Sequence, residues 1–211
     1  MNPDEIPRLF DCFFATSERV EAAVREHLKR LVERGRFRIS LRRDDLRGFI
    51  VQAAATRGSQ SMAFYRPAGW PSGTIRVGGG FWFGQLAKKL KCKAVSVSVS
   101  NEAGSEERTL TRFELLQPGV TDGAQWRERT LQVHLDDSGK WYFSARGEPL
   151  PFENLDHYRQ RSVKARLTPA ITAEYLEALG CPVRSQGFWQ PSGDLLVVEE
   201  AVAETNPSGD H

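Results

Sequence analysis

Residues 130–146 contain two short alternating segments separated by a tight turn. The apolar residues recur at every second position, as Leu131, Val133 and Leu135 in the first segment and Trp141, Phe143 and Ala145 in the second. Alternation with a period of two is typical of a strand that buries one face, and Asp137-Ser138-Gly139 between the segments suits a hairpin turn. The sequence therefore predicts an antiparallel hairpin.

A second hairpin is expected just before it. In AVSVSVS, Val95, Val97 and Val99 alternate with serines, and the acidic loop NEAGSEE leads into a possible partner strand, RTLTRFELL. Valine is favoured in strands, and the loop separates two segments of similar length. The second half of the chain is therefore expected to be rich in antiparallel sheet.

The first 43 residues predict a helix followed by a strand of arginines. Apolar residues recur at helical spacing over 17–34, and Gly35 follows as a stop signal. From residue 37 the period changes to two, with Phe37, Ile39 and Leu41 on one face. The other face of this strand consists almost entirely of arginine.

The middle of the chain is less regular. Residues 44–56 fit either a helix or a buried strand, and we favour the helix. Short strands are predicted at 61–66 and 74–77, a Pro/Gly turn at 66–73, and an amphipathic helix at 81–91. After residue 147 we expect a polar connector and two short helices. Thr168 and Pro169 mark the start of the second helix.

These elements predict a single-domain α+β fold. Its sheet should be largely antiparallel, with the helices at the N-terminus and after the main hairpins packing on one face. The domain should span residues 1–200, with a last strand at 195–198 returning to the sheet. Residues 201–211 are expected to form a disordered tail, because its segment AETNPSGDH has no apolar content to hold it in place.

The charge of the chain is divided between its halves. Residues 1–100 carry 18 Lys and Arg against 9 Asp and Glu, whereas residues 101–211 carry 11 against 18. No carboxylate occurs between Asp45 and Glu102. A basic segment of this kind favours a polyanionic partner.

The polar faces of the predicted strands suggest where that partner would bind. If the strands pair as expected, they form one broad surface of arginines and hydroxyls, made of Arg36, Arg38, Ser40, Arg42, Thr74, Arg76, Ser96, Ser98, Ser100, Gln132, His134, Tyr142, Ser144 and Arg146. The expected polyanion contacts are Arg36, Arg38, Arg42, Arg43, Arg76, Lys88 and Lys89. The expected stacking rings are Tyr65, Trp70, Trp82 and Tyr142. The opposing interpretation is that these arginines are a solvated face paired with the acidic half, and that Trp70 and Trp82 belong to the core.

Other motifs are weaker. Gly78, Gly79 and Gly80 stand between a strand and a helix, where backbone amides can hold a phosphate, but no phosphate-loop motif accompanies them and we favour a bulge or turn that requires glycine. The histidines, His27, His134, His157 and His211, lack metal-ligand spacing, so no metal or cofactor is expected. His134 and Asp136 form an acid/base cluster only if the fold brings Asp156 and His157 to them, and no nucleophile motif accompanies them.

The sequence also indicates the expected cellular location of the protein and the state of its cysteines. No apolar run is long enough to span a membrane and the N-terminus lacks the basic residues of a signal peptide, so we expect a cytoplasmic protein with no membrane partner. Cys12, Cys92 and Cys181 form no CxxC pair and are expected to be reduced, buried thiols.

The sequence thus favours a non-catalytic protein that binds a phosphate-rich partner, with nucleic acid as the favoured candidate. The alternative is an inhibitor or a toxin-neutralising immunity protein, which would bind a basic protein through the acidic half. The residues available for that role include Glu106, Glu107, Asp122, Glu128, Asp136, Asp137 and Glu153. A third possibility is an enzyme with an unrecognised His/Asp site. The oligomeric state is left open.

Overall fold

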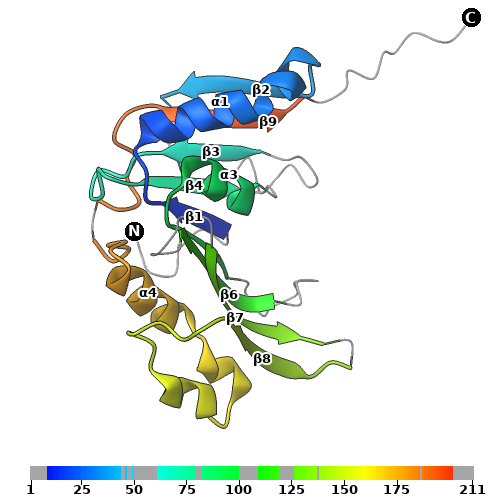
Figure 1. Cartoon of the computed structure of the whole chain (residues 1–211), viewed down its shortest axis with the longest axis vertical. Helices are drawn as coiled ribbons and strands as arrows, with labels where there is room; N and C mark the ends of the chain where they lie inside the picture. Colours follow the sequence, from blue (N-terminus) through cyan, green and yellow to red (C-terminus); the bar gives the residue numbers. More distant parts are fainter. Residues whose placement is uncertain are drawn as a thin grey trace, which may run out of the picture.

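The computed structural model describes residues 9–43, 46, 49, 61–78, 82–99, 109–118, 126–136, 138–185 and 187–201. Within these residues the strands form one nine-stranded antiparallel sheet, in the order β2-β9-β3-β4-β1-β5-β6-β7-β8 (Figure 1). The strands are β1 (Leu9–Phe13), β2 (Phe37–Arg42), β3 (Met62–Tyr65), β4 (Thr74–Gly78), β5 (Ala94–Val99), β6 (Thr109–Pro118), β7 (Trp126–Leu135), β8 (Trp141–Arg146) and β9 (Leu195–Glu200). The helices are α1 (Ser17–Glu33), α3 (Phe83–Leu90) and α4 (Pro169–Ala178), with 3₁₀ helices η2 (Leu155–Arg159) and η3 (Val163–Arg166).

The predicted α+β class and antiparallel sheet are confirmed. Both hairpins form as expected, because Val97 of β5 lies opposite Phe113 of β6, and Val133 of β7 lies opposite Phe143 of β8. The last strand also returns to the sheet. It inserts between β2 and β3, so the arginine-bearing β2 is the outermost strand at one end.

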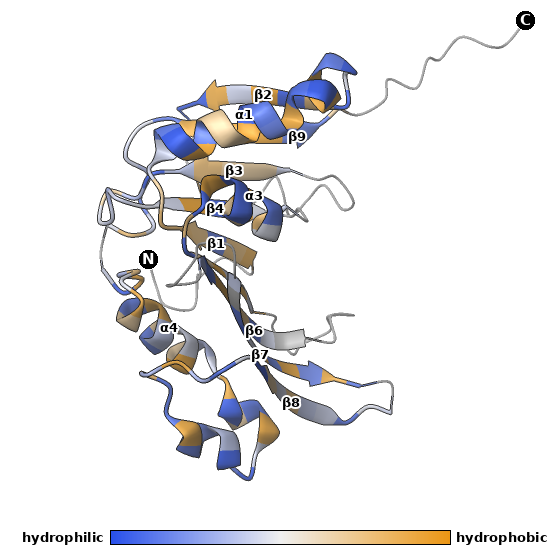
Figure 2. Ribbon diagram, in the orientation of Figure 1, coloured by the Kyte–Doolittle hydropathy of each residue, from blue (hydrophilic) through white to orange (hydrophobic). Residues whose placement is uncertain are grey.

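Helices cover both faces of the sheet, and not the single face that the sequence suggested. On β1, Phe10 and Cys12 join a core that includes Leu176 of α4, whereas Phe13 joins a second core built with α1 and α3. Successive side chains of a strand point to opposite faces, so the two cores lie on opposite sides. We call these sides the α4 face and the α1 face. Figure 2 shows that α1 carries both hydrophilic and apolar residues, as expected for a helix with one buried side.

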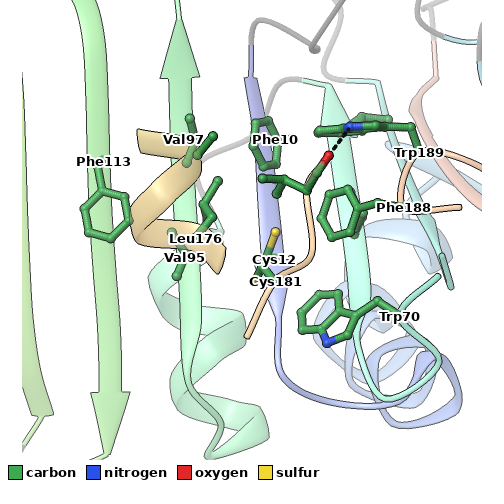
Figure 3. Packing of buried hydrophobic residues seen from close by; sticks show 14 of the residues in the cluster. Phe10, Cys12, Trp70, Val95, Val97, Phe113, Leu176, Cys181, Phe188 and Trp189 are labelled. Carbon is green, nitrogen blue, oxygen red and sulfur yellow. Dashed lines mark hydrogen bonds between the residues drawn. The ribbon is translucent and has the colours of Figure 1, made fainter. Parts of the chain in front are cut away.

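The core on the α4 face is rich in aromatic rings (Figure 3). Trp70 packs against Phe188, and Trp189 donates a hydrogen bond from Nε1 to the Val183 carbonyl at 3.1 Å. Cys12 lies beside Cys181 in this core. All three cysteines are free and buried, as predicted, and burial raises the pKa of the Cys12 thiol well above its ordinary value.

Two local predictions lie partly outside the described residues. Leu46 and Phe49 are helical and buried, which agrees with the helix favoured for 44–56, but the other residues of that segment are not described. The predicted tail also lies outside the description beyond Ala201. In α4, by contrast, Thr168 caps the helix as expected, and its side chain accepts a hydrogen bond from the Ile171 amide.

Candidate functional site

The broad arginine surface expected from the sequence is divided between the two faces of the sheet. Phe37 and Ile39 of β2 pack against the core on the α1 face. Arg38, Ser40 and Arg42 alternate with them and therefore point to the α4 face. The polar residues of β4 to β8 point the other way, since Val95, Val97, Leu131 and Val133 belong to the core on the α4 face.

Arg76, one of the expected polyanion contacts, is not on a surface. Its side chain is 2% exposed and forms an ion pair with Asp11, which is completely buried on the neighbouring strand β1. Burial raises the pKa of Asp11, although the Arg76 guanidinium acts in the opposite direction. Arg76 therefore serves the core and cannot meet a phosphate in this structure.

Most of the other expected polyanion contacts have acidic neighbours. The ion pairs are Arg42 with Glu199 at 2.7 Å, Arg43 with Asp194 at 3.4 Å, Lys89 with Glu26 at 3.0 Å and Lys88 with Glu128 at 3.9 Å. Arg36 and Arg38 are exposed, and neither forms an ion pair with a described carboxylate. The β2 end of the sheet therefore keeps an excess of positive charge at these two residues.

Of the four expected stacking rings, Tyr142 is well exposed. Tyr65 and Trp70 are buried in the core, and Trp82 is partly buried with its ring against those of His27 and Phe37. These three rings support the packing interpretation that the sequence left open. Tyr142 of β8 is 46% exposed.

The glycine segment favours the turn interpretation. Gly78 has φ of +96°, and a Cβ at this position would lie 2.3 Å from the Ser61 carbonyl oxygen. Glycine is thus required by backbone conformation and by a close strand neighbour. Gly79 and Gly80 lie outside the described residues.

The possible His/Asp cluster does not assemble. Asp136 accepts hydrogen bonds from the amides of Lys140 and Ser138 within the β7–β8 turn, and these bonds lower its pKa. His134 lies on the α1 face. Its proposed partner His157 lies in η2, whose Tyr158 packs on Phe143 at the α4 face.

The acidic residues of the second half do not gather on one described surface. Glu153 is buried against Arg129, and Asp136 is engaged in its turn. Glu128 is 61% exposed. Glu106, Glu107, Asp122 and Asp137 lie outside the described residues.

The structure instead presents a polar, open part of the sheet at its β8 end. On the α1 face, the core built with α1 and α3 includes residues of β2, β9, β3, β1 and β5, and it reaches β6 at Leu116 and β7 at Trp126. β8 forms the opposite end of the sheet (Figure 1). Beyond Leu116 and Trp126 the polar side chains are at least partly exposed. We call this surface the open face, and it consists of Ser96, Ser98, Arg112, Glu114, Thr130, Gln132, His134, Tyr142, Ser144 and Arg146.

Strand pairing orders the open face into rows. One row runs Ser98, Arg112, Gln132, Ser144, and the next runs Ser96, Glu114, Thr130, Arg146. His134 lies opposite Tyr142, with ring centroids 6.2 Å apart and planes inclined by 31°. Two flat rings thus lie side by side on an open sheet.

Polar groups surround this ring pair. The Gln132 side-chain nitrogen lies 3.5 Å from His134 Nδ1. Arg112 donates a hydrogen bond to Glu114 at 2.5 Å. Arg146 is exposed and forms no ion pair with any carboxylate in the described part of the chain. The open face thus combines rings, hydrogen-bonding groups and one uncompensated cation.

Sequence reasoning placed Gln132, Ser144 and Arg146 on a polar surface without assigning them a role, and the only role it considered for His134, on the same surface, was in an acid/base cluster. It missed Arg112 and Glu114 as members. Their signal is the alternation of these two residues with Phe113 and Leu115, which places them on the face that the core does not occupy.

No family model, curated protein or solved structure matches this chain. Among the described residues, no helix is both long and apolar enough to cross a membrane. Within the same residues no group of three or more His, Cys, Asp or Glu side chains is placed to hold a metal ion.

Proposed function

We propose that this protein binds single-stranded nucleic acid through the open face of β5 to β8. The observation that carries the proposal is the exposed Tyr142 ring beside His134 on a sheet surface that no described helix covers. Aromatic rings on an exposed sheet stack on unpaired bases, and a paired duplex does not offer its base faces in this way.

The neighbours of the rings supply the remaining contacts. Arg146 is available for a phosphate. Gln132 and Ser144 lie opposite each other on β7 and β8, and their amide and hydroxyl groups can hydrogen-bond to base edges. The site would therefore hold a base on the rings and a phosphate at the sheet edge.

Charge alone does not account for this binding. Arg112 is matched by Glu114, which leaves Arg146 as the main uncompensated cation. Each phosphate contact on a single strand contributes about 0.7 to the slope of log affinity against log salt. We therefore expect a shallow salt dependence with a slope of roughly −1, and stacking on Tyr142 should supply most of the affinity.

The test is fluorescence anisotropy with labelled single-stranded RNA, single-stranded DNA and duplex DNA. Wild-type protein should prefer the single strands. Tyr142→Ala should weaken single-strand binding about tenfold or more, since stacking contributes about 1–3 kcal/mol per base. Tyr142→Phe keeps the ring and should bind within about twofold of wild type.

Arg38→Ser serves as the matched control, because Arg38 is exposed on the other face at the far end of the sheet. It should leave single-strand binding unchanged. The proposal fails if wild-type protein binds no single strand at low salt, or if Tyr142→Ala binds as well as wild type.

A further inference from the structure

The outer edge of β2 is open in the described structure. β2 pairs with β9 on one side, and no other described strand pairs with it. Figure 1 shows β2 as the outermost strand beside α1. An open edge exposes backbone donors and acceptors that can pair with an additional strand.

The phase of the β2–β9 ladder identifies which backbone groups face outward. The Ala201 amide donates to the Arg36 carbonyl at 2.9 Å, and the register continues from this pair through Phe37 opposite Glu200. In an antiparallel pair, hydrogen-bonded positions alternate with positions whose backbone groups point away. Arg38, Ser40 and Arg42 therefore bond to β9, while the amides and carbonyls of Phe37, Ile39 and Leu41 face the open edge.

The side chains of β2 indicate which types of residue an added strand should have. Leu41 is 54% exposed and Ile39 is partly buried on the α1 face. Arg38 and Arg42 lie on the other face, and Arg38 has no ion-pair partner among the described residues. Residues opposite each other on adjacent strands share a face and interact directly. Arg42 already pairs with Glu199 of β9. The added strand should therefore place apolar side chains beside Leu41 and a carboxylate beside Arg38.

A second copy of this chain fits the edge poorly. Pairing β2 with another β2 would bring the arginines of two strands together on one face, and like charges in close cross-strand positions are destabilising. The charge of the edge thus disfavours self-association and favours an acidic partner.

From these observations we infer that the β2 edge binds an extended segment of a partner protein in which apolar and acidic residues alternate. The segment adds a strand antiparallel to β2, through the backbone of Phe37, Ile39 and Leu41. This site is separate from the open face, since β2 and β8 are the two ends of the sheet.

The probe is a short fluorescein-labelled peptide of alternating valine and glutamate. It should bind wild-type protein, and a peptide with lysine in place of glutamate should not. Methylating the backbone nitrogens of the valines removes the hydrogen bonds to β2 and should reduce binding about tenfold or more. Methylating those of the glutamates, which face away from β2, should have little effect. This comparison leaves the protein unchanged, so altered folding cannot explain it.

Variants test the same edge from the protein side. Leu41→Pro removes an outward amide that β9 does not use, and proline is tolerated on sheet edges, so it should weaken peptide binding about tenfold. Leu41→Val should bind like wild type. Arg38→Ser should weaken binding and reduce its salt dependence.

Three outcomes would overturn the inference. The first is no binding of the acidic peptide, and the second is an equal loss of binding affinity for both methylated peptides. The third is binding of a single-stranded oligonucleotide at β2 that Arg38→Ser abolishes and Leu41→Pro does not. Tyr142→Ala should leave peptide binding unchanged. Failure at β2 is therefore distinguishable from failure at the open face.

Discussion

Asp11 of β1 and Arg76 of β4 lie directly opposite each other in the middle of the sheet and form a buried ion pair. Cross-strand neighbours extend this pair outward through Ser96, Glu114 and Thr130 to Arg146 on the edge strand. One polar row thus runs from the core to the open face. The ion pair joins β4 to β1, which in turn pairs with β5, the first strand of the open face.

We predict that Asp11→Asn strongly destabilises the protein, because it leaves the buried Arg76 charge without its carboxylate. The free energy of unfolding should fall by about 3–5 kcal/mol, measured by urea denaturation. Replacing both residues together, as Asp11→Leu with Arg76→Met, should recover much of that loss. The exposed pair of Glu21 and Arg25 provides a control, and Glu21→Gln should cost about 0.5 kcal/mol or less. A loss below about 1 kcal/mol for Asp11→Asn would contradict the role given to this pair.

Glu153 should make stability depend on pH in the acid range. Burial raises the pKa of Glu153, but hydrogen bonds from Arg129, Tyr158 and the Leu150 amide outweigh burial, and the net effect lowers the pKa. A carboxyl group with a lowered folded pKa stabilises the fold above its unfolded pKa of about 4.3, and this contribution is lost as the pH falls through the folded value. The stability gap between wild type and Glu153→Gln, measured in urea, should therefore shrink as the pH falls below about 4.3. A gap that stays constant down to the acid limit of folding would exclude this linkage.

Gly147 and Gly139 form a matched pair for testing the end of β8. Both have positive φ, +84° and +79°, but a Cβ on Gly147 would lie 2.0 Å from the Glu128 carbonyl oxygen, while Gly139 has open space around it. Gly139→Ala should lower the free energy of unfolding by about 1–2 kcal/mol, because alanine disfavours positive φ. Gly147→Ala should lower the free energy of unfolding clearly more, because β8 must also move away from β7. Equal thermal unfolding midpoints for the two variants would show that this close approach does not matter.

Arg146 should contribute one phosphate contact. Arg146→Gln is expected to reduce the slope of log affinity against log salt by about 0.7 for a single strand. Arg161→Gln removes an exposed charge from the segment between η2 and η3 and should leave the slope unchanged. Anisotropy titrations at several salt concentrations measure both. An unchanged slope in Arg146→Gln would show that Arg146 does not contact a phosphate.

The sequence predicted individual strands better than it predicted shared surfaces. Alternation shows which residues of β7 lie on the same side as His134, but it does not show which side that is relative to Arg38 of β2. That relation depends on the insertion of β9 between β2 and β3, a long-range pairing without a local signal. The expected single surface therefore divided into two.

Burial on both faces of the sheet explains the other differences between the structure and what the sequence predicted. In β4 the period of two placed Arg76 on a polar face, but β4 lies near the centre of a sheet with a core on each side. Position in the sheet decided its environment, and the buried Asp11 made the arrangement possible. β1 itself was not predicted, since LFDCF is short and its polar residue faces a core. Tyr142 could be placed on the surface because it alternates with Trp141 and Phe143, which are partly buried against the core on the α4 face.

The most direct test of the proposed function is an NMR titration of ¹⁵N-labelled protein with a single-stranded oligonucleotide. We expect the largest amide shifts to cluster in β6, β7 and β8 around His134 and Tyr142, and the amides of β2 to remain unchanged. Shifts centred on β2, or no shifts at all, would contradict the assignment of nucleic-acid binding to the open face.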